Sequence, residues 1–306
     1  MVLLSAASVA QDVVQQIVSG LATGGVYASL ALALVLIYRS MEALNFAQGE
    51  LAMFSTFIAW TLITAVHLNY YLAFAITIAV SITGGILLER VVIRPVEKAP
   101  PLTVVLVTLG LFFVVNGLAG LIWQYVIKAF PGPPGFSQAP VSLGGVALGM
   151  QDLFLIGVTV VLLGMLYAFF QYTKLGLAMR SAALYPETSR LLGVRVSWML
   201  ALGWGLAAVL GAVAGMMAAP SLFVITPSFM QVILIYSFAA AVLGGIESPV
   251  GAVVGGLTLG VAINLLGTYV DFVTEELRLP VALAILLGVL ILRPAGLFGR
   301  VVVRRV

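Results

Sequence analysis

Residues 41–53 read MEALNFAQGELAM and place three polar side chains, those of Asn45, Gln48 and Glu50, beside a long apolar part of the chain. The preceding residues 13–37 contain no charged residue, and this segment is longer than the ~20 residues that a helix needs to span a bilayer. The stretch is therefore predicted to join two membrane-spanning helices.

The composition of the 306-residue chain is that of an integral membrane protein. Hydrophobic residues make up 62% and charged residues 8%, and the mean hydropathy is +1.20. The chain has no cysteine and one histidine, His67, which excludes disulfides and thiolate metal sites and argues against a haem or zinc site. We expect neither a cofactor nor a catalytic site.

Further apolar segments after the first predict an all-α polytopic membrane protein with about nine spans, within a range of about eight to ten. Two of these spans are weak, because one starts with the polar stretch and the last is shorter than a usual span. The expected spans are residues 13–37, 46–66, 70–88, 102–125, 153–171, 198–219, 229–246, 249–270 and 279–292.

The basic residues gather on one side when about nine spans are threaded with the N-terminus outside. All of the 14 Lys and Arg residues except Lys128 and Arg278 then lie on the side of the C-terminus. An excess of basic residues marks the cytoplasmic side of a membrane protein. We therefore expect the N-terminus outside and the C-terminus inside, and no nucleic-acid partner.

Two connections are longer than a hairpin between helices needs. The outer one, residues 126–152, is rich in Pro and Gly, and is either a compact loop over the outer mouth or a plain surface linker. The inner one, residues 172–197, places Pro186 and Glu187 where a helix would start and Gly193 where it would stop.

The inner connection is thus expected to form a short amphipathic helix at residues 186–192. On spacing alone, such a helix either rests among lipid headgroups or docks a soluble partner.

Four segments resemble the branched-chain amino acid ABC transporter permeases of the LivH type. They are GLATGGVYASLALALVLIYRSMEALNFAQGELAM at 20–53, ERVVIRPVEKAPPL at 89–102, GLAMRSAALYPETSRLLGVRV at 176–196 and SFAAAVLGGIESPVGAVVGGL at 237–257. The resemblance covers nearly the whole chain. It implies one permease domain over residues 1–306 with an inverted repeat, located in the bacterial plasma (inner) membrane.

The resemblance also implies partners. These are a LivM-like second permease, two cytoplasmic ATPase subunits and a periplasmic or lipid-anchored substrate-binding protein, with membrane lipid around the permeases. No Gly-Lys-Ser/Thr phosphate loop occurs in this chain, so it is not expected to be an enzyme, and ATP hydrolysis is expected on the partner subunits.

The segment at 176–196 is similar to the docking loop of the family, which favours a helix that couples the permease to an ATPase. The residues expected in this coupling are Arg180, Tyr185, Glu187, Arg190, Leu191, Leu192, Gly193, Val194 and Arg195.

The polar stretch itself allows two compatible interpretations. If the second helix starts after Asn45, that residue is its N-cap, Gln48 completes a reciprocal capping arrangement, and Glu50 lies in the second turn near the cytoplasmic start. Alternatively, Gln48 and Glu50 face a wet vestibule or the partner permease.

Polar side chains within the spans are the candidates for a translocation pathway, because their exposure to lipid is costly. They are Tyr27, Asn45, Gln48, Glu50, Asn116, Gln231, Ser237 and Asn264. We expect no carboxylate deep in the membrane, which disfavours the alternative of an ion-coupled secondary transporter of a small polar solute. The solute could be a branched-chain amino acid, another amino acid, urea or an amide.

Small residues four positions apart predict close contacts between helices. The pairs are Gly20 and Gly24, Gly211 and Gly215, Gly251 and Gly255, and Gly256 and Gly260.

Overall fold

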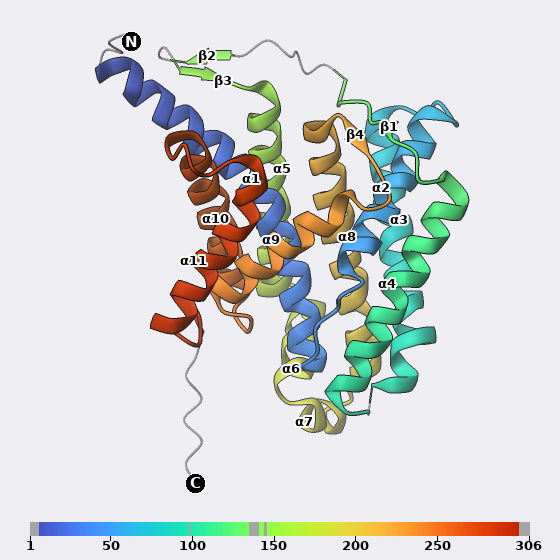
Figure 1. The fold of residues 1–306 in the computed structure, drawn as a ribbon. Coiled ribbons are helices and arrows are strands. Elements are labelled where there is room, and N and C mark those ends of the chain that lie inside the picture. Colours follow the sequence, from blue (N-terminus) through green and yellow to red (C-terminus); the bar gives the residue numbers. More distant parts are fainter. Residues whose placement is uncertain (1–5, 98, 135–140, 144–145, 300–306) are drawn as a thin grey trace.

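The structure, a computed structural model, describes residues 6–97, 99–134, 141–143 and 146–299. Every segment predicted to span the membrane is helical, which confirms the all-α prediction (Figure 1). The helices are α1 (Ala6–Met41), α2 (Gln48–Thr64), α3 (Tyr70–Leu88), α4 (Pro101–Trp123), α5 (Met150–Tyr172), α8 (Val196–Leu222), α9 (Phe229–Gly244), α10 (Pro249–Tyr269) and α11 (Arg278–Leu292). A π-helical turn (Glu89–Ile93) and a 3-10 turn (Arg94–Val96) extend α3.

Six helices in the described part are long and apolar enough to cross a membrane, namely α1, α3, α4, α5, α8 and α10. The other three are shorter, with 17 residues in α2, 16 in α9 and 15 in α11. About nine spans therefore stays a prediction.

Helices α1 and α8 form the centre of the molecule and pack against each other. Helix α10 packs on α1, and helix α3 packs on α8. Helix α4 lies at the periphery, where one face packs on α2 and much of the rest is exposed (Figure 1).

Several element boundaries in the first half of the chain correspond to boundaries in the second half. A shift of 181 residues, the separation of Glu50 and Gln231, carries the end of α1 onto the end of α8, the start of α2 onto the start of α9, and the end of α3 onto the end of α10. In Figure 1, α1 descends from the N-terminus whereas α8 ascends from the opposite side. This correspondence is the pattern that an inverted repeat predicts.

The predicted pairs of small residues lie at contacts between helices. A Cβ atom on Gly24 would lie 2.9 Å from the carbonyl oxygen of Gly256, so α1 and α10 meet backbone to backbone. A Cβ atom on Gly215 would lie 2.9 Å from the carbonyl oxygen of Ala52, which brings α8 equally close to α2. Larger residues at these positions would force the helices apart.

The described part of the outer connection packs on the rest of the molecule. Strand β1 (Lys128–Ala129) pairs with β4 (Val224–Ile225) in antiparallel register, and the indole N–H of Trp60 donates to the carbonyl oxygen of Ala129 over 2.9 Å. Strands β2 (Val141–Leu143) and β3 (Val146–Leu148) pair in antiparallel register, and β3 packs on α1. The connection therefore tethers the loop between α8 and α9 instead of forming a plain linker.

Candidate functional site

Two sharp corners place the starts of α2 and α9 in the interior of the molecule (Figure 1). The first corner, residues 42–47, follows α1, and the second corner, residues 223–228, follows α8. Each corner begins with a residue other than glycine at positive φ, Glu42 at 51° and Phe223 at 59°. These left-handed residues end the long helices and turn the chain back into the protein.

The predicted capping arrangement at Asn45 is wrong. Helix α2 begins at Gln48, and its N-cap, Ala47, makes no side-chain capping bond. The Asn45 side chain accepts from the backbone N–H of Ala47 over 3.1 Å and donates to Gln48 Oε1 over 3.1 Å. The physical reason is that the Gln48 amide is used elsewhere, because its Nε2 donates to the carbonyl oxygen of Ala207 in α8 over 2.9 Å.

The contact with Ala207 also corrects the predicted depth of Glu50. Ala207 lies near the middle of α8, so α2 starts level with the middle of a spanning helix and not at the cytoplasmic edge. Glu50 lies in the first turn of α2 and is 1% exposed. Glu50 is therefore a buried carboxylate near the level of the middle of α8, which argues against the expectation that no carboxylate lies deep in the membrane.

The Glu50 carboxylate joins three helices. Its Oε2 accepts from Asn116 Nδ2 of α4 over 2.9 Å, and its Oε1 accepts from Gln231 Nε2 of α9 over 3.1 Å. The Asn116 amide also donates to the carbonyl oxygen of Pro227, over 2.9 Å. Both carboxylate oxygens of Glu50 thus have a partner, as a buried carboxylate requires.

We call this set the polar junction. It brings together five of the predicted pathway residues, which are Asn45, Gln48, Glu50, Asn116 and Gln231. The first three are buried, whereas Asn116 and Gln231 are half-buried and reach the molecular surface. The junction therefore connects the interior to one face of the protein.

The other three predicted pathway residues lie outside the polar junction and have separate partners. The ring of Tyr27 stacks on Tyr236 with a centroid separation of 5.0 Å. The Ser237 hydroxyl donates to the carbonyl oxygen of Ile233 within its own helix. The Asn264 amide donates to the backbone carbonyl oxygen of Gln16 over 2.7 Å and so ties α10 to α1.

The sequence reasoning missed three residues that support the junction. Thr108 of α4 accepts from the backbone N–H of Phe46 over 3.4 Å and holds the first corner. Tyr125 donates to Asn116 Oδ1 over 2.7 Å, and Pro227 supplies a carbonyl oxygen. A single hydroxyl in an apolar span gives no signal in sequence, because most such hydroxyls bond only to their own helix.

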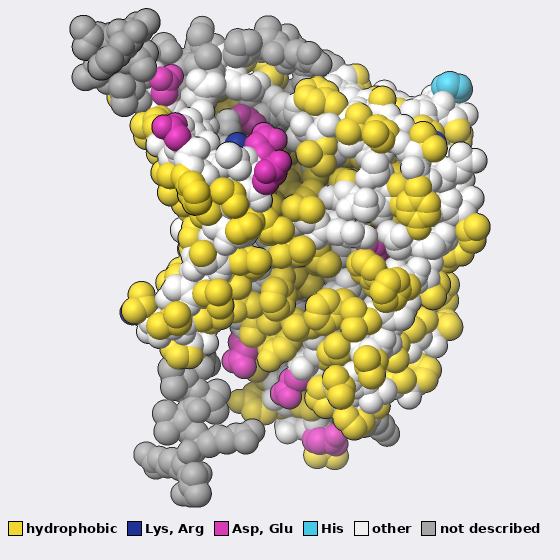
Figure 2. All heavy atoms as spheres, in the orientation of Figure 1, with side chains coloured by type: hydrophobic (Ala, Val, Ile, Leu, Met, Phe, Trp, Pro, Cys, Tyr) yellow, Lys and Arg dark blue, Asp and Glu magenta, His cyan; other side chains and the backbone are white. Residues whose placement is uncertain are grey.

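The face around Asn116 and Gln231 is apolar. Phe113 of α4 is 70% exposed and Val232 of α9 is 50% exposed. Figure 2 shows that hydrophobic side chains cover most of this side of the molecule, while the carboxylates gather mainly toward its two ends. A surface that faces only lipid is expected to carry apolar side chains alone, whereas this face also carries two half-buried amides.

The inner connection forms two helices, α6 (Lys174–Leu184) and α7 (Pro186–Leu191). The helix predicted at 186–192 matches α7, whereas α6 was not predicted. A Cβ atom on Gly176 would lie 2.6 Å from the Cα atom of Phe170, so α6 folds tightly back on the end of α5. The connection is therefore a packed platform and not a free loop.

Most of the predicted coupling residues lie at the tip of this platform. Leu191 is 89% exposed and Leu192 is 77% exposed. The side chains of Glu187 and Arg190 form an exposed ion pair of 3.0 Å with each other. The tip also includes Tyr185, Gly193, which has a φ of 83°, and Arg195.

Two predicted coupling residues lie elsewhere. Val194 is half-buried and packs on the cluster of Ala182, Val196 and Leu200. Arg180 lies on α6, where its Nη1 donates to Gln171 Oε1 over 3.4 Å. Neither side chain is part of the exposed tip.

The chain is similar to known permeases over nearly its full length. The family described as "Branched-chain amino acid transport system / permease component" matches residues 16–291. The high-affinity branched-chain amino acid transport system permease protein BraD of Pseudomonas aeruginosa is 33% identical over 302 residues, which cover 95% of this chain and 97% of BraD. LivH of Salmonella typhimurium is 28% identical over 310 residues, with coverage of 95% and 97%.

A relative in Methanocaldococcus jannaschii, a probable branched-chain amino acid transport permease protein LivH, is 27% identical over 278 residues, with coverage of 88% and 87%. Among solved structures, PsaBC from Streptococcus pneumoniae in complex with Fab aligns with a TM-score of 0.46 and 13% identity, covering 90% of this chain and 89% of the other, too weak a similarity to support a conclusion. The family match and the BraD relative confirm the resemblance drawn from the sequence. The chain belongs to the family of permease components of branched-chain amino acid transport systems.

Proposed function

We propose that this permease forms, together with a related LivM-like permease, the path by which branched-chain or other amino acids enter the cell. ATP hydrolysis on two cytoplasmic subunits drives the transport, and a substrate-binding protein delivers the solute. The single observation that carries this proposal is the polar junction, where α2 and α9 both begin in the interior and their third residues, Glu50 and Gln231, meet.

Helices that begin inside a membrane protein are a common way to build a transport site, because irregular backbone is tolerated there only where it is covered by protein or lines a cavity. In the polar junction, the half-buried amides of Asn116 and Gln231 lie between the buried Glu50 and the apolar face. We place the translocation route along this face and the second permease across it. The apolar side chains of α4 and α9 would then be covered by the partner.

The chain is a multi-pass protein of the plasma membrane, as its family and its apolar helices indicate. In our proposal it crosses the membrane about nine times, with α2, α9 and α11 completed as spans by their neighbours, and its N-terminus lies outside. The side that is rich in basic residues then faces the cytoplasm, and α6 and α7 lie on that side. The relatives BraD and LivH are named as branched-chain amino acid permeases, which favours leucine-type solutes here.

The exposed tip of the platform formed by α6 and α7 is the proposed contact with an ATPase subunit. Leu191 and Leu192 provide an apolar anchor, and the ion pair of Glu187 and Arg190 lies beside it. An apolar side chain buried in a partner contributes more to binding than an exposed ion pair, which is worth only ~0–1 kcal/mol.

The test uses the complete transporter in liposomes with leucine-loaded binding protein, and measures leucine uptake, ATP hydrolysis and co-purification of the ATPase. Leu191→Asp is expected to lower uptake at least about tenfold, because it places a charge in an apolar contact. The matched variant Arg190→Ala should retain most of the uptake. Wild-type uptake and assembly with Leu191→Asp would show that the tip rests among lipid headgroups instead.

A further inference from the structure

A cavity of about 460 Å³ lies between α1, α5, α6, α8 and α10, away from the polar junction. Its size falls in the range of ~300–1,000 Å³ that is usual for sites of small ligands. Most of its wall is aliphatic, with Leu32 of α1, Leu163 of α5 and Val253 of α10 among the lining residues. At its rim, Tyr167 is 64% exposed and Val250 is 65% exposed, so the cavity opens sideways between α5 and α10.

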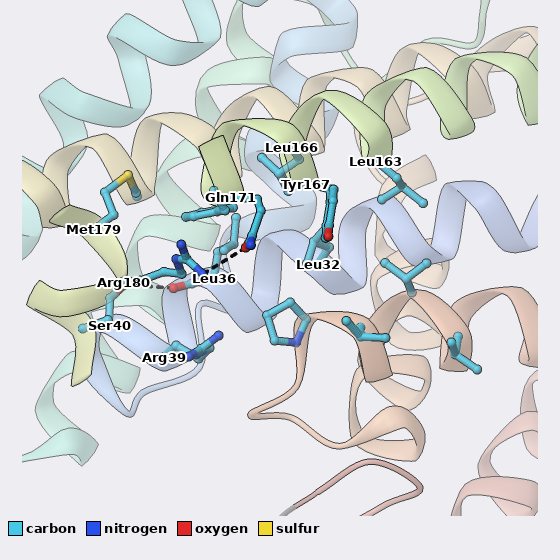
Figure 3. A pocket seen from close by; sticks show the side chains of 17 residues that line it. Leu32, Leu36, Arg39, Ser40, Leu163, Leu166, Tyr167, Gln171, Met179 and Arg180 are labelled. Carbon is cyan, nitrogen blue, oxygen red and sulfur yellow. Dashed lines mark hydrogen bonds between the residues drawn. The ribbon is translucent and has the colours of Figure 1, made fainter. Parts of the chain in front are cut away.

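Two arginine side chains lie together at one end of this cavity, while Leu32 and Leu163 lie toward the other end (Figure 3). Arg39 comes from the last turn of α1, and Arg180 comes from α6. No Asp or Glu is among the residues of the described chain that line the cavity. The cavity is therefore apolar along its length and positively charged at one end.

The guanidinium of Arg180 is incompletely satisfied. Its Nε is buried and has no hydrogen-bond partner in the part of the chain that the structure describes, and its bond to Gln171 is long at 3.4 Å. A guanidinium presents five N–H donors in a planar fork that matches a carboxylate or a phosphate. Because the Arg180 side chain lines the cavity, the N–H groups of its guanidinium are placed to meet an acceptor that enters from outside.

We propose that this cavity binds one anionic phospholipid, with its phosphate on Arg39 and Arg180 and an acyl chain along Leu32, Leu163 and Val253. The lateral opening suits a ligand that arrives from the bilayer, and the basic end lies at the end of α1 and on α6, on the side that the sequence predicts to be cytoplasmic. Basic pockets between membrane helices on that side are suited to anionic headgroups. The lipid would brace α6, and with it the platform that holds α7, against α1 and α5.

The test is native mass spectrometry of the complete, delipidated transporter titrated with phosphatidylglycerol or with phosphatidylcholine of the same acyl chains. The wild type should retain one more phosphatidylglycerol than the double variant Arg39→Gln/Arg180→Gln, whose affinity for that lipid should fall roughly tenfold or more. Retention of phosphatidylcholine should be the same in both. Arg293→Gln, an exposed arginine that does not line the cavity, is the matched charge control and should behave as the wild type.

A second pair of variants tests the apolar part of the site without touching its charges. Val250→Trp narrows the opening and should also lower phosphatidylglycerol retention, whereas Val160→Trp, at an equally exposed position of α5 outside the cavity, should not. Equal retention of both lipids by the wild type, or unchanged retention by both cavity variants, would overturn the proposal. If inorganic phosphate alone displaces the lipid, the cavity is a simple anion site. If the arginine variants lose subunit assembly, the two arginines bind a protein partner. Either result also rejects the lipid.

Discussion

The first corner, residues 42–47, and the second corner, residues 223–228, have the same backbone plan and different chemistry. Each begins with a left-handed residue, and each leads into a short helix that starts inside the protein. The first corner, however, leads to a carboxylate at the third position of its helix, Glu50, whereas the second leads to an amide, Gln231. The shift of 181 residues places Thr226 at the position of Asn45 and Phe229 at the position of Gln48, so neither amide is repeated in the second half.

This difference has a physical reason. The repeat places Glu50 and Gln231 at equivalent positions that contact each other, so the two side chains must complement one another. Two carboxylates would repel at this distance, whereas a carboxylate and an amide form a donor and acceptor pair. Where equivalent positions of two repeats contact each other, the backbones can stay alike although the two side chains must differ.

The largest expected effect comes from making the two corners alike. Gln231→Glu would put a second carboxylate about 3 Å from Glu50 in a buried site, and should destabilise the permease by at least about 2 kcal/mol. Leucine uptake by the reconstituted transporter and the midpoint of thermal aggregation should both fall strongly. Gln231→Leu, which removes the amide without adding charge, is the matched control and should have a smaller effect.

Exchanging the two side chains sharpens the comparison. The double variant Glu50→Gln/Gln231→Glu restores one carboxylate and one amide in the reverse order. Its thermal midpoint should recover most of the loss caused by Gln231→Glu alone, because the donor and acceptor pair is formed again. If the double variant is as unstable as the sum of the two single variants, the direct contact is not what couples the corners.

The smallest expected effect concerns the left-handed residues that the corners share. A side chain at positive φ costs roughly 1–2 kcal/mol, and glycine removes that cost but loses more entropy on folding. Glu42→Gly and Phe223→Gly should therefore each raise stability by at most about 1 kcal/mol, with transport unchanged. A large loss in either variant, seen in the thermal midpoint, would show that the side chain itself holds the corner.

The sequence predicted the apolar helices and α7, because apolar length and flanking polar residues are local properties, but it missed α6. It could not predict how deep α2 starts, since the level of Gln48 is set by its bond to Ala207, far away in the chain. Asn116 and Gln231 were predicted as pathway residues from the cost of exposing amides to lipid, but their bonds to Glu50 depend on how α4 and α9 pack. The resemblance of residues 176–196 to the docking loop of the family grouped Arg180 with the coupling residues, whereas in the structure its side chain lines the cavity beside Gln171.

The central claim is that the face carrying Gln231 lines the translocation route between two permeases. The most direct measurement is the reaction of a single cysteine with a water-soluble, membrane-impermeant thiol reagent, because the chain has no cysteine of its own. The sample is the complete transporter in liposomes with the substitution Gln231→Cys. The lipid-facing control carries Val160→Cys on the exposed side of α5. Labelling of this subunit is measured by mass spectrometry with and without ATP. The account predicts that Gln231→Cys reacts with the reagent in one nucleotide state and is protected from it in the other. Its reaction should be slower when leucine-loaded binding protein is present. Val160→Cys should stay unlabelled. Gln231→Cys that stays unlabelled in every state, as a residue against lipid would, contradicts it.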